Sequence, residues 1–266
     1  MKIIEYYNCK EQEYWLNEIK KSDWRAAQHL YEHIKNNELK TLCGENTKVL
    51  LLTEGDHLMS FCTYAEQDDV RNTSLTPWVG YVYTFPAYRG RRCIGKLLEY
   101  AYQLAREEGF EYMYISSDEE GLYEKYGFQF YQTMKNHHGE DTSVFRIKIE
   151  RKDYNDILGK EVIGTIDRPI GSVHPKYPEI IYPVNYGYVD GVIADDGEQQ
   201  DVYVFGTDQP LKTFKGTVIS VYHRINDCED KWIVSINGTK PSKEEILETI
   251  SFQEQYFMGE LYEKTE

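Results

Sequence analysis

A short segment of the sequence combines arginine, lysine and glycine in a way that suits the binding of an anion. It runs from Tyr88 to Lys96 and contains three arginines, two glycines and one lysine. The preceding residues, Trp78–Phe85, predict a strand, and those from about Gly95 to Glu108 predict a helix. N–H groups at a helix start lack internal partners and the helix dipole is positive there, so this turn suits a pyrophosphate. The alternative is a basic turn that pairs only with nearby carboxylates.

A second segment, Gly121–Phe130, predicts a short helix that runs into a strand and carries Tyr123. Taken together, Phe85–Gly90, Gly95–Leu98 and Leu122–Phe128 resemble the GNAT family of N-acetyltransferases. The resemblance extends in element order from the first residue to about residue 150, and its specific motifs lie between residues 81 and 130. It implies a mixed α/β sheet domain that moves an acetyl group from acetyl-CoA to an amine.

The resemblance also implies roles for individual residues. Residues expected to bind the acetyl-CoA cofactor are Val82 and Thr84, through backbone contacts with pantetheine, and Gly90, Arg91, Arg92, Cys93, Ile94, Gly95 and Lys96, around the pyrophosphate. Tyr123 would be the catalytic general acid, because the ordinary pKa of tyrosine, about 10, lies near that of a leaving thiol. A packing role for Tyr123 is the alternative, since the chain has 24 tyrosines.

The segment departs from the family pattern at two positions. Cys93 occupies the place of a usual glycine and Gly90 that of a usual arginine or glutamine, so the loop is shifted by one residue relative to Arg89. A thiol at a helix start invites a nucleophilic role for Cys93, but direct acyl transfer needs no nucleophile from the enzyme. No general base is identified. An acidic run, Glu66 with Asp68 and Asp69, either attracts a cationic amine or forms a solvated face.

A second group of chemically active residues lies in the last third of the chain. Asp196, Glu198 and Asp201 follow a turn and enter a predicted strand, and Asp227 and Asp230 lie in a further acidic turn. Converging carboxylate oxygens suit Mg²⁺, and five clustered carboxylates repel one another unless a cation offsets their charge. The alternative is a pair of acidic hairpin turns.

This region resembles soluble inorganic pyrophosphatase of the barrel type (family I). The matching segments are Tyr182–Tyr188, Asp196–Asp201, the acids Asp227 and Asp230, and Phe252–Tyr256. The resemblance implies Mg²⁺ ligands at Asp196, Glu198, Asp201, Asp227 and Asp230, catalytic roles for Asp201 and Tyr186, and phosphate binding by Lys176, Tyr186, Lys231 and Tyr256. Diphosphate would then be hydrolysed to phosphate by two-metal chemistry.

The departures in this region favour a second interpretation. Glu198 replaces an aspartate, Phe257 stands where the family has a lysine, and the arginine strand before Tyr182 has no counterpart beyond Arg168 and Lys176. The barrel could therefore be a non-catalytic module that binds metal or phosphate or mediates dimerisation, since a fold does not fix a function.

The elements that must position these residues predict a two-domain α+β protein. Expected strands in the first half are Lys2–Tyr7, Val49–Thr53, His57–Tyr64, Trp78–Phe85, Phe110–Ser116, Phe128–Gln132 and Ser143–Glu150, with helices at Glu11–Trp24, Arg25–Leu39, 95–108 and Glu119–Tyr126. Expected strands in the second half are Glu161–Asp167, Ile180–Gly191, Gln200–Gly206, Gly216–His223 and Trp232–Ile236, before a helix capped by Ser242 and Glu245. Short, evenly spaced strands indicate a small barrel closed by one helix. A polar stretch, Arg151–Lys160, predicts the boundary, giving a GNAT domain over residues 1–152 and a pyrophosphatase-like domain over residues 155–266.

Composition limits the partners. The net charge of −15 argues against nucleic acid and against an anionic membrane surface. Five scattered cysteines, among them Cys228, favour a reducing cytoplasm over a disulfide framework, and no apolar run is long enough for a signal peptide or a membrane span. We therefore expect a cytoplasmic, bifunctional enzyme that uses a small-molecule or peptide amine as acceptor and diphosphate as a second substrate. Homo-oligomer formation is left open.

Overall fold

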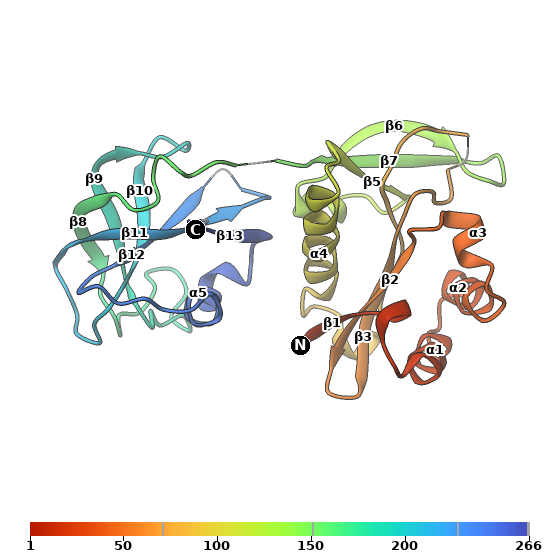
Figure 1. Ribbon diagram of the computed structural model, residues 1–266, viewed down its shortest axis with the longest axis horizontal. Coiled ribbons are helices and arrows are strands. Elements are labelled where there is room, and N and C mark those ends of the chain that lie inside the picture. The colour runs from red at the N-terminus through yellow and green to blue at the C-terminus, as the bar shows by residue number, and fades with distance from the viewer. Residues whose placement is uncertain (71, 151, 228, 265–266) are drawn as a thin grey trace. The chain divides into compact units, whose positions relative to one another are not determined.

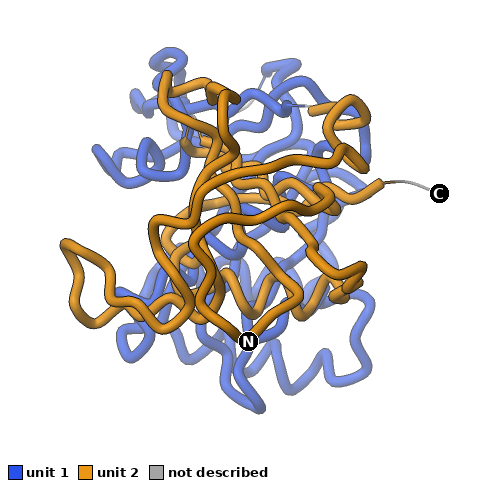
Figure 2. The backbone as a smooth tube through the Cα atoms, turned by 90° about the vertical axis from the view of Figure 1, so that its left-hand side faces the viewer, with its two compact units in different colours: residues 1–151 blue, residues 152–266 orange. Residues whose placement is uncertain are grey.

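The structure is a computed structural model that describes residues 1–70, 72–150, 152–227 and 229–264. The chain divides into two compact units, Met1–Arg151 and Lys152–Glu266 (Figure 2). Arg151, where the predicted boundary stretch begins, and Cys228 lie outside the described residues. Of the helices described, none combines the length and the apolar character that crossing a membrane requires.

The first unit is built on a seven-stranded mixed sheet (Figure 1). Its strands are β1 (Lys2–Glu5), β2 (Lys48–Glu54), β3 (His57–Ala65), β4 (Trp78–Thr84), β5 (Tyr112–Ser117), β6 (Gln129–Lys135) and β7 (Asp141–Lys148). The strand order is β1-β2-β3-β4-β5-β7-β6, and β4 runs parallel to β5 whereas the other neighbours are antiparallel. Among the described residues β4 and β5 share a single registered pair, Trp78 with Tyr114, so the two strands diverge beyond it.

Helices cover both faces of this sheet. The helices α1 (Gln12–Lys20), α2 (Arg25–Lys35) and α3 (Leu39–Cys43) lie on one face, and α4 (Cys93–Glu107) lies on the other (Figure 1). Three 3-10 turns complete the unit, η1 (Tyr6–Asn8), η2 (Pro86–Tyr88) and η3 (Tyr123–Tyr126). One face of α4 is apolar at helical spacing, and Leu97, Ala101 and Ala105 on that face are fully buried. Packing of this face fixes the start of α4 beside the end of β4.

Two details of the first unit differ from the sequence prediction. The helix predicted over Glu119–Tyr126 is wrong in its first half, because the regular turn begins only at Tyr123. Gly121 has a φ of +70°, a left-handed conformation that interrupts a right-handed helix. The helix α3 was not predicted, since its five residues are too few for a periodic pattern.

The second unit is a closed five-stranded barrel with one helix, as the strand spacing predicted. Its strands are β8 (Glu161–Arg168), β9 (Asn185–Ile193), β10 (Gln199–Phe205), β11 (Thr213–Arg224) and β12 (Asp230–Ser235). The order β12-β10-β9-β8-β11 closes through a β11–β12 pairing, and β13 (Gly259–Glu263) extends β11. The helix α5 (Lys243–Glu254) begins with the predicted capping box, in which Ser242 and Glu245 satisfy each other's backbone N–H groups.

Valine side chains fill the barrel. Val202, Val204, Val218, Val221 and Val234 have no exposed surface and belong to one apolar cluster. A second cluster, in which Ile246 and Ile250 of α5 take part, lies against the outer side of the same strands. Along β10 and β12, successive side chains point alternately into and out of the barrel. This alternation decides which of them reach the end of the barrel where the charged side chains lie.

Candidate active site

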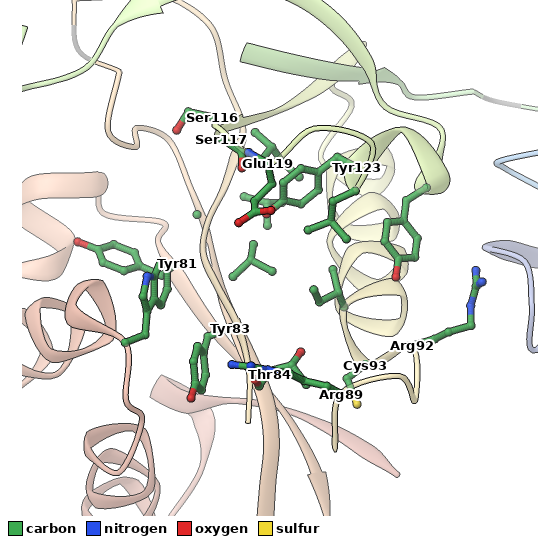
Figure 3. A pocket seen from close by; sticks show the side chains of 18 of the residues that line it. Tyr81, Tyr83, Thr84, Arg89, Arg92, Cys93, Ser116, Ser117, Glu119 and Tyr123 are labelled. Carbon is green, nitrogen blue, oxygen red and sulfur yellow. Dashed lines mark hydrogen bonds between the residues drawn. The ribbon is translucent and has the colours of Figure 1, made fainter. Parts of the chain in front are cut away.

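A cavity of about 800 Å³ lies in the first unit where β4 and β5 diverge. Its wall includes β4, the turn that leads into α4, the end of β5 and the segment that carries Tyr123 (Figure 3). The side chains of Asp23 and Trp24, at the start of α2, and of Asp68, between β3 and β4, also line it. Segments far apart in sequence therefore meet around one volume that can hold a ligand.

The strand β4 is irregular beside this cavity. Tyr81 has a φ of +49°, and the pairing of β3 with β4 shifts between Phe61 and Thr63. Such a bulge leaves backbone groups outside the regular ladder and turns the strand. The predicted backbone-contact residues Val82 and Thr84 follow the bulge and line the cavity.

The turn before α4 presents only part of the predicted pyrophosphate set to the cavity. The lining members are Gly90, Arg92, Cys93 and Ile94, together with Arg89, which was not in that set. Arg91 instead pairs with Glu54 at 3.0 Å, and Lys96 is exposed. Gly95 is buried against Tyr126, where a Cβ would fall 2.8 Å from a ring carbon. The helix start therefore remains open to an anion, whereas Gly95 serves the packing of α4.

Tyr123 both packs and faces the cavity. Its ring contacts Phe128 and Phe145, with centroid distances of 6.2 Å and 6.3 Å. Figure 3 shows its ring beside Glu119, with both side chains reaching inward from the segment after β5. Burial raises the pKa of Tyr123, so the phenol keeps its proton at neutral pH. A protonated, cavity-lining phenol is the arrangement that a proton donor requires.

The Cys93 thiol does not have the properties of a nucleophile. Its side chain is buried, and burial raises its pKa although Arg91 acts in the opposite direction. The sulfur lies 3.6 Å from the carbonyl oxygen of Tyr88 and can donate to it. A thiol held in its neutral form suits packing under the turn rather than attack on a substrate.

The acidic run before β4 separates into three different environments. Glu66 accepts hydrogen bonds from the backbone and side chain of Asn46, at 3.1 and 2.9 Å, and does not line the cavity. Asp69 pairs with His137. Of these three acids, Asp68 alone lines the cavity, together with Asp23 and Glu119 from other elements. From the sequence alone, Glu66, Asp68 and Asp69 were taken as one acidic run, and Asp68 was not singled out.

In the second unit, Asp201 lies between two side chains that were predicted to bind phosphate. Its Oδ2 atom accepts from the Tyr186 hydroxyl at 2.6 Å and pairs with the Lys231 ammonium at 2.5 Å. Lys231 is 1% exposed and also pairs with Glu229. The two predicted phosphate ligands Lys176 and Tyr256 are exposed instead. The structure thus brings Asp201, Tyr186 and Lys231 together.

The remaining predicted metal ligands are distributed over separate contacts. Asp230 bonds to His223 at 2.7 Å and to Tyr154 at 2.5 Å. Asp227 bonds to Arg224 at 3.1 Å, whereas Asp196 and Glu198 are exposed in the turn before β10. Hydrogen bonding and ion pairing within the chain already engage four of the five carboxylates, because Asp196 Oδ1 also accepts from the backbone N–H of Glu198 at 2.9 Å.

An arginine missed by the sequence analysis organises this end of the barrel. Arg224 is 2% exposed and pairs with Glu254 at 2.8 Å and with Glu229 at 3.0 Å. Its guanidinium carbon also lies 3.5 Å from the centroid of the Phe257 ring. The two buried cations, Arg224 and Lys231, therefore offset the acidic charge that the sequence assigned to Mg²⁺. Within the described ranges no three His, Cys, Asp or Glu side chains gather as a metal site would require, so the residues present do not fit the implied ion.

Comparisons with known proteins agree with this division. Residues 11–128 match the model of the acetyltransferase (GNAT) family. An inorganic pyrophosphatase of Saccharolobus solfataricus is 30% identical over 104 residues, which cover 36% of this chain and 52% of that protein. The chain thus spans about half the length of this relative.

Solved structures are similar to each unit. The aminoglycoside 6'-N-acetyltransferase of Enterococcus faecium covers 57% of this chain and 99% of its own length, with 12% identity and a TM-score of 0.44. An inorganic pyrophosphatase of Neisseria gonorrhoeae covers 39% of this chain and 81% of its own length, with 21% identity and a TM-score of 0.30. Residues 11–128 of this chain thus match the GNAT acetyltransferase family model, and its C-terminal region is similar in sequence to an inorganic pyrophosphatase.

Proposed function

We propose that the first unit transfers an acetyl group from acetyl-CoA to a primary amine of a small molecule or peptide. The observation that carries this proposal is the cavity, which joins the start of α4 at one end to Tyr123 at the other. Acetyl-CoA supplies a thioester whose carbonyl carbon is open to attack by an amine. Its anionic half suits the unpartnered N–H groups at the start of α4, near Arg89 and Arg92.

In this proposal the chain contributes orientation and a proton. Backbone groups of Val82 and Thr84, beyond the bulge in β4, would hold the pantetheine arm along the strand. Tyr123 would then donate its proton to the departing sulfur. The phenol is protonated when the thiolate forms, although burial raises its pKa and so makes it a weaker acid than an exposed tyrosine.

Replacement of Tyr123 tests the role of the phenol. Tyr123→Phe should lower kcat by about 10²-fold or more, the usual contribution of a general acid, and leave acetyl-CoA affinity nearly unchanged. Tyr112→Phe, outside the cavity on β5, is the matched control. Release of free thiol measures turnover, and titration calorimetry measures binding. An equal loss of binding and turnover in Tyr123→Phe would contradict the assignment.

For the second unit, the resemblance to inorganic pyrophosphatase supports Mg²⁺-dependent hydrolysis of diphosphate as one candidate function. The contacts of the barrel favour the other candidate, a non-catalytic module. Asp201 is neutralised by Lys231, and Arg224 is enclosed by Glu254, Asp227 and Glu229. The carboxylates and the two cations named here are already paired with one another. Among these residues, the carboxylates are therefore not free to bind a metal ion, and the cations are not free to bind a phosphate.

Phosphate release by the full chain separates these candidates. A diphosphatase should release phosphate from diphosphate in the presence of Mg²⁺ and lose this activity in Asp201→Asn. A non-catalytic barrel should release none. Release that persists in Asp201→Asn would contradict the assignment of Asp201 as a metal ligand. A cytoplasmic location stays a prediction from the cysteine content.

A further inference from the structure

The carboxylate of Asp68 is built into the wall of the acetyl-transfer cavity. It lies between β3 and β4, and its Oδ2 atom accepts a hydrogen bond from Ser116 Oγ at 3.0 Å. Ser116 belongs to the end of β5, and it also lines the cavity. The hydrogen bond therefore connects the loop before β4 to the strand from which β4 diverges.

A glycine in β4 makes room for this carboxylate. A Cβ at position 80 would fall 2.3 Å from Oδ1 of Asp68 and 3.1 Å from Oγ1 of Thr63. No side chain can occupy that space without displacing the carboxylate. Asp68 thus lies directly over the β4 backbone, one residue before the bulge at Tyr81. The Asp68 carboxylate, the β4 backbone at Gly80 and the bulge at Tyr81 therefore lie together beside the cavity, where β4 and β5 diverge.

We propose that Asp68 is the general base of the acetyl transfer, the group that takes the proton from the attacking amine. This inference rests on the proposed acetyltransferase function. The neutral amine forms a bond from nitrogen to the thioester carbonyl carbon, and the carbon–sulfur bond breaks. The surplus proton on nitrogen moves to the Asp68 carboxylate, and the thiolate takes the proton of Tyr123. Transfer of the proton from Asp68 to the Tyr123 phenolate through solvent then restores both groups.

The surroundings of Asp68 suit a base that works near neutral pH. Burial raises its pKa to about 6, Ser116 and His137 act to lower it, and Asp69 acts to raise it. Tyr123 lines the same cavity as Asp68, and the Asp68 charge contributes to the raised pKa of the phenol. A base of this strength is still ionised at pH 7 and binds a proton more readily than an exposed aspartate does.

Asp68→Asn tests the inference with little change of shape, because an amide oxygen can still accept from Ser116. Glu66→Gln, which removes the same charge two residues away and outside the cavity, is the matched control. The full chain is assayed for thiol release with acetyl-CoA and a panel of primary amines that includes diamines, amino sugars and short peptides. We expect Asp68→Asn to lower kcat by about 10²-fold or more, with acetyl-CoA affinity within twofold of the wild type and Glu66→Gln unchanged.

The pH profile distinguishes a base from a structural residue. With an acceptor amine of low basicity, which stays neutral over this range, the wild-type rate should fall as the pH drops through about 6, and this limb should be absent from Asp68→Asn. The loss in Asp68→Asn should also shrink for amines of low basicity, because their adducts give up the nitrogen proton more readily. Wild-type kcat and the same acidic limb in Asp68→Asn would overturn the role of Asp68. Absence of transfer by the wild-type chain to every amine tested would overturn the proposed function itself.

Discussion

Replacing Asp68 with asparagine should make the first unit more stable at neutral pH. The wild-type carboxylate is held in the cavity wall, where burial raises its pKa from 3.8 to about 6. Ionisation is therefore less favourable in the folded protein than in the unfolded chain. An asparagine at this position keeps the contact with Ser116 and carries no charge, so it removes this cost.

The size of the effect follows from the two pKa values. One pKa unit corresponds to about 1.4 kcal/mol, so the change from 3.8 to about 6 costs about 3 kcal/mol when the group is fully ionised. Above about pH 6 the whole cost is present. Below 3.8 both the folded and the unfolded forms are protonated, and the cost vanishes. The advantage of Asp68→Asn should thus grow from near zero at pH 3.5 to about 3 kcal/mol at pH 7.5.

Urea unfolding of the full chain at these two pH values measures the difference. Three of the four tryptophans, Trp15, Trp24 and Trp78, lie in the first unit, so tryptophan fluorescence reports mainly on it. Glu66→Gln is the control, because Glu66 is exposed and its pairing with Asn46 survives the change. Equal stability of Asp68→Asn and the wild type at pH 7.5 would refute the reasoning. A stabilised variant with reduced turnover would show that its loss of activity is not due to misfolding.

Three further predictions concern other contacts. Gly80→Ala should lower kcat about as much as Asp68→Asn, because the new methyl group displaces the carboxylate; an unchanged kcat in a thiol-release assay would contradict this. Glu254→Gln should lower the free energy of unfolding of the second unit by about 3 kcal/mol, since Arg224 loses a buried partner; a thermal-unfolding loss below about 1 kcal/mol would argue against it. Lys231→Met should leave Asp201 without its cation, whereas Glu229 keeps its pairing with Arg224, so millimolar Mg²⁺ should raise the melting temperature of this variant. Under the same conditions the wild type should not respond, and a wild-type rise of several degrees would contradict the internal charge balance.

The sequence predicted most of the elements and both folds, because the signals that carry them are local. The capping residues Ser242 and Glu245 and the alternation of the barrel strands act within a few residues. The β13 strand was missed since it is short and gains its stability from pairing with β11, far away in sequence. The helix predicted before Tyr123 was shortened by Gly121, whose backbone conformation overrides a weak helical pattern.

The contents of the two sites were predicted less completely. Motifs drew attention to Tyr123 and to the start of α4, which line the cavity, but Asp68, which lines it too, could not be separated from its acidic neighbours. What distinguishes it is a contact with Ser116, 48 residues away, and the space above Gly80. In the barrel, Arg224 was overlooked because nothing in its local sequence shows that it is enclosed by Glu254 from α5. Partners contributed by distant segments decide the role of a charged side chain.

The contact between Arg224 and Phe257 has a consequence for how the barrel tolerates substitution. Phe257, whose ring lies against the guanidinium, stands where the pyrophosphatase resemblance expects a lysine. A lysine restored there alone would bring a second positive charge against a buried arginine, and an altered Arg224 alone would leave Glu254 without its cation. Either single change costs stability, so positions 224 and 257 are coupled, and a substitution at one of them is tolerated only together with a substitution at the other.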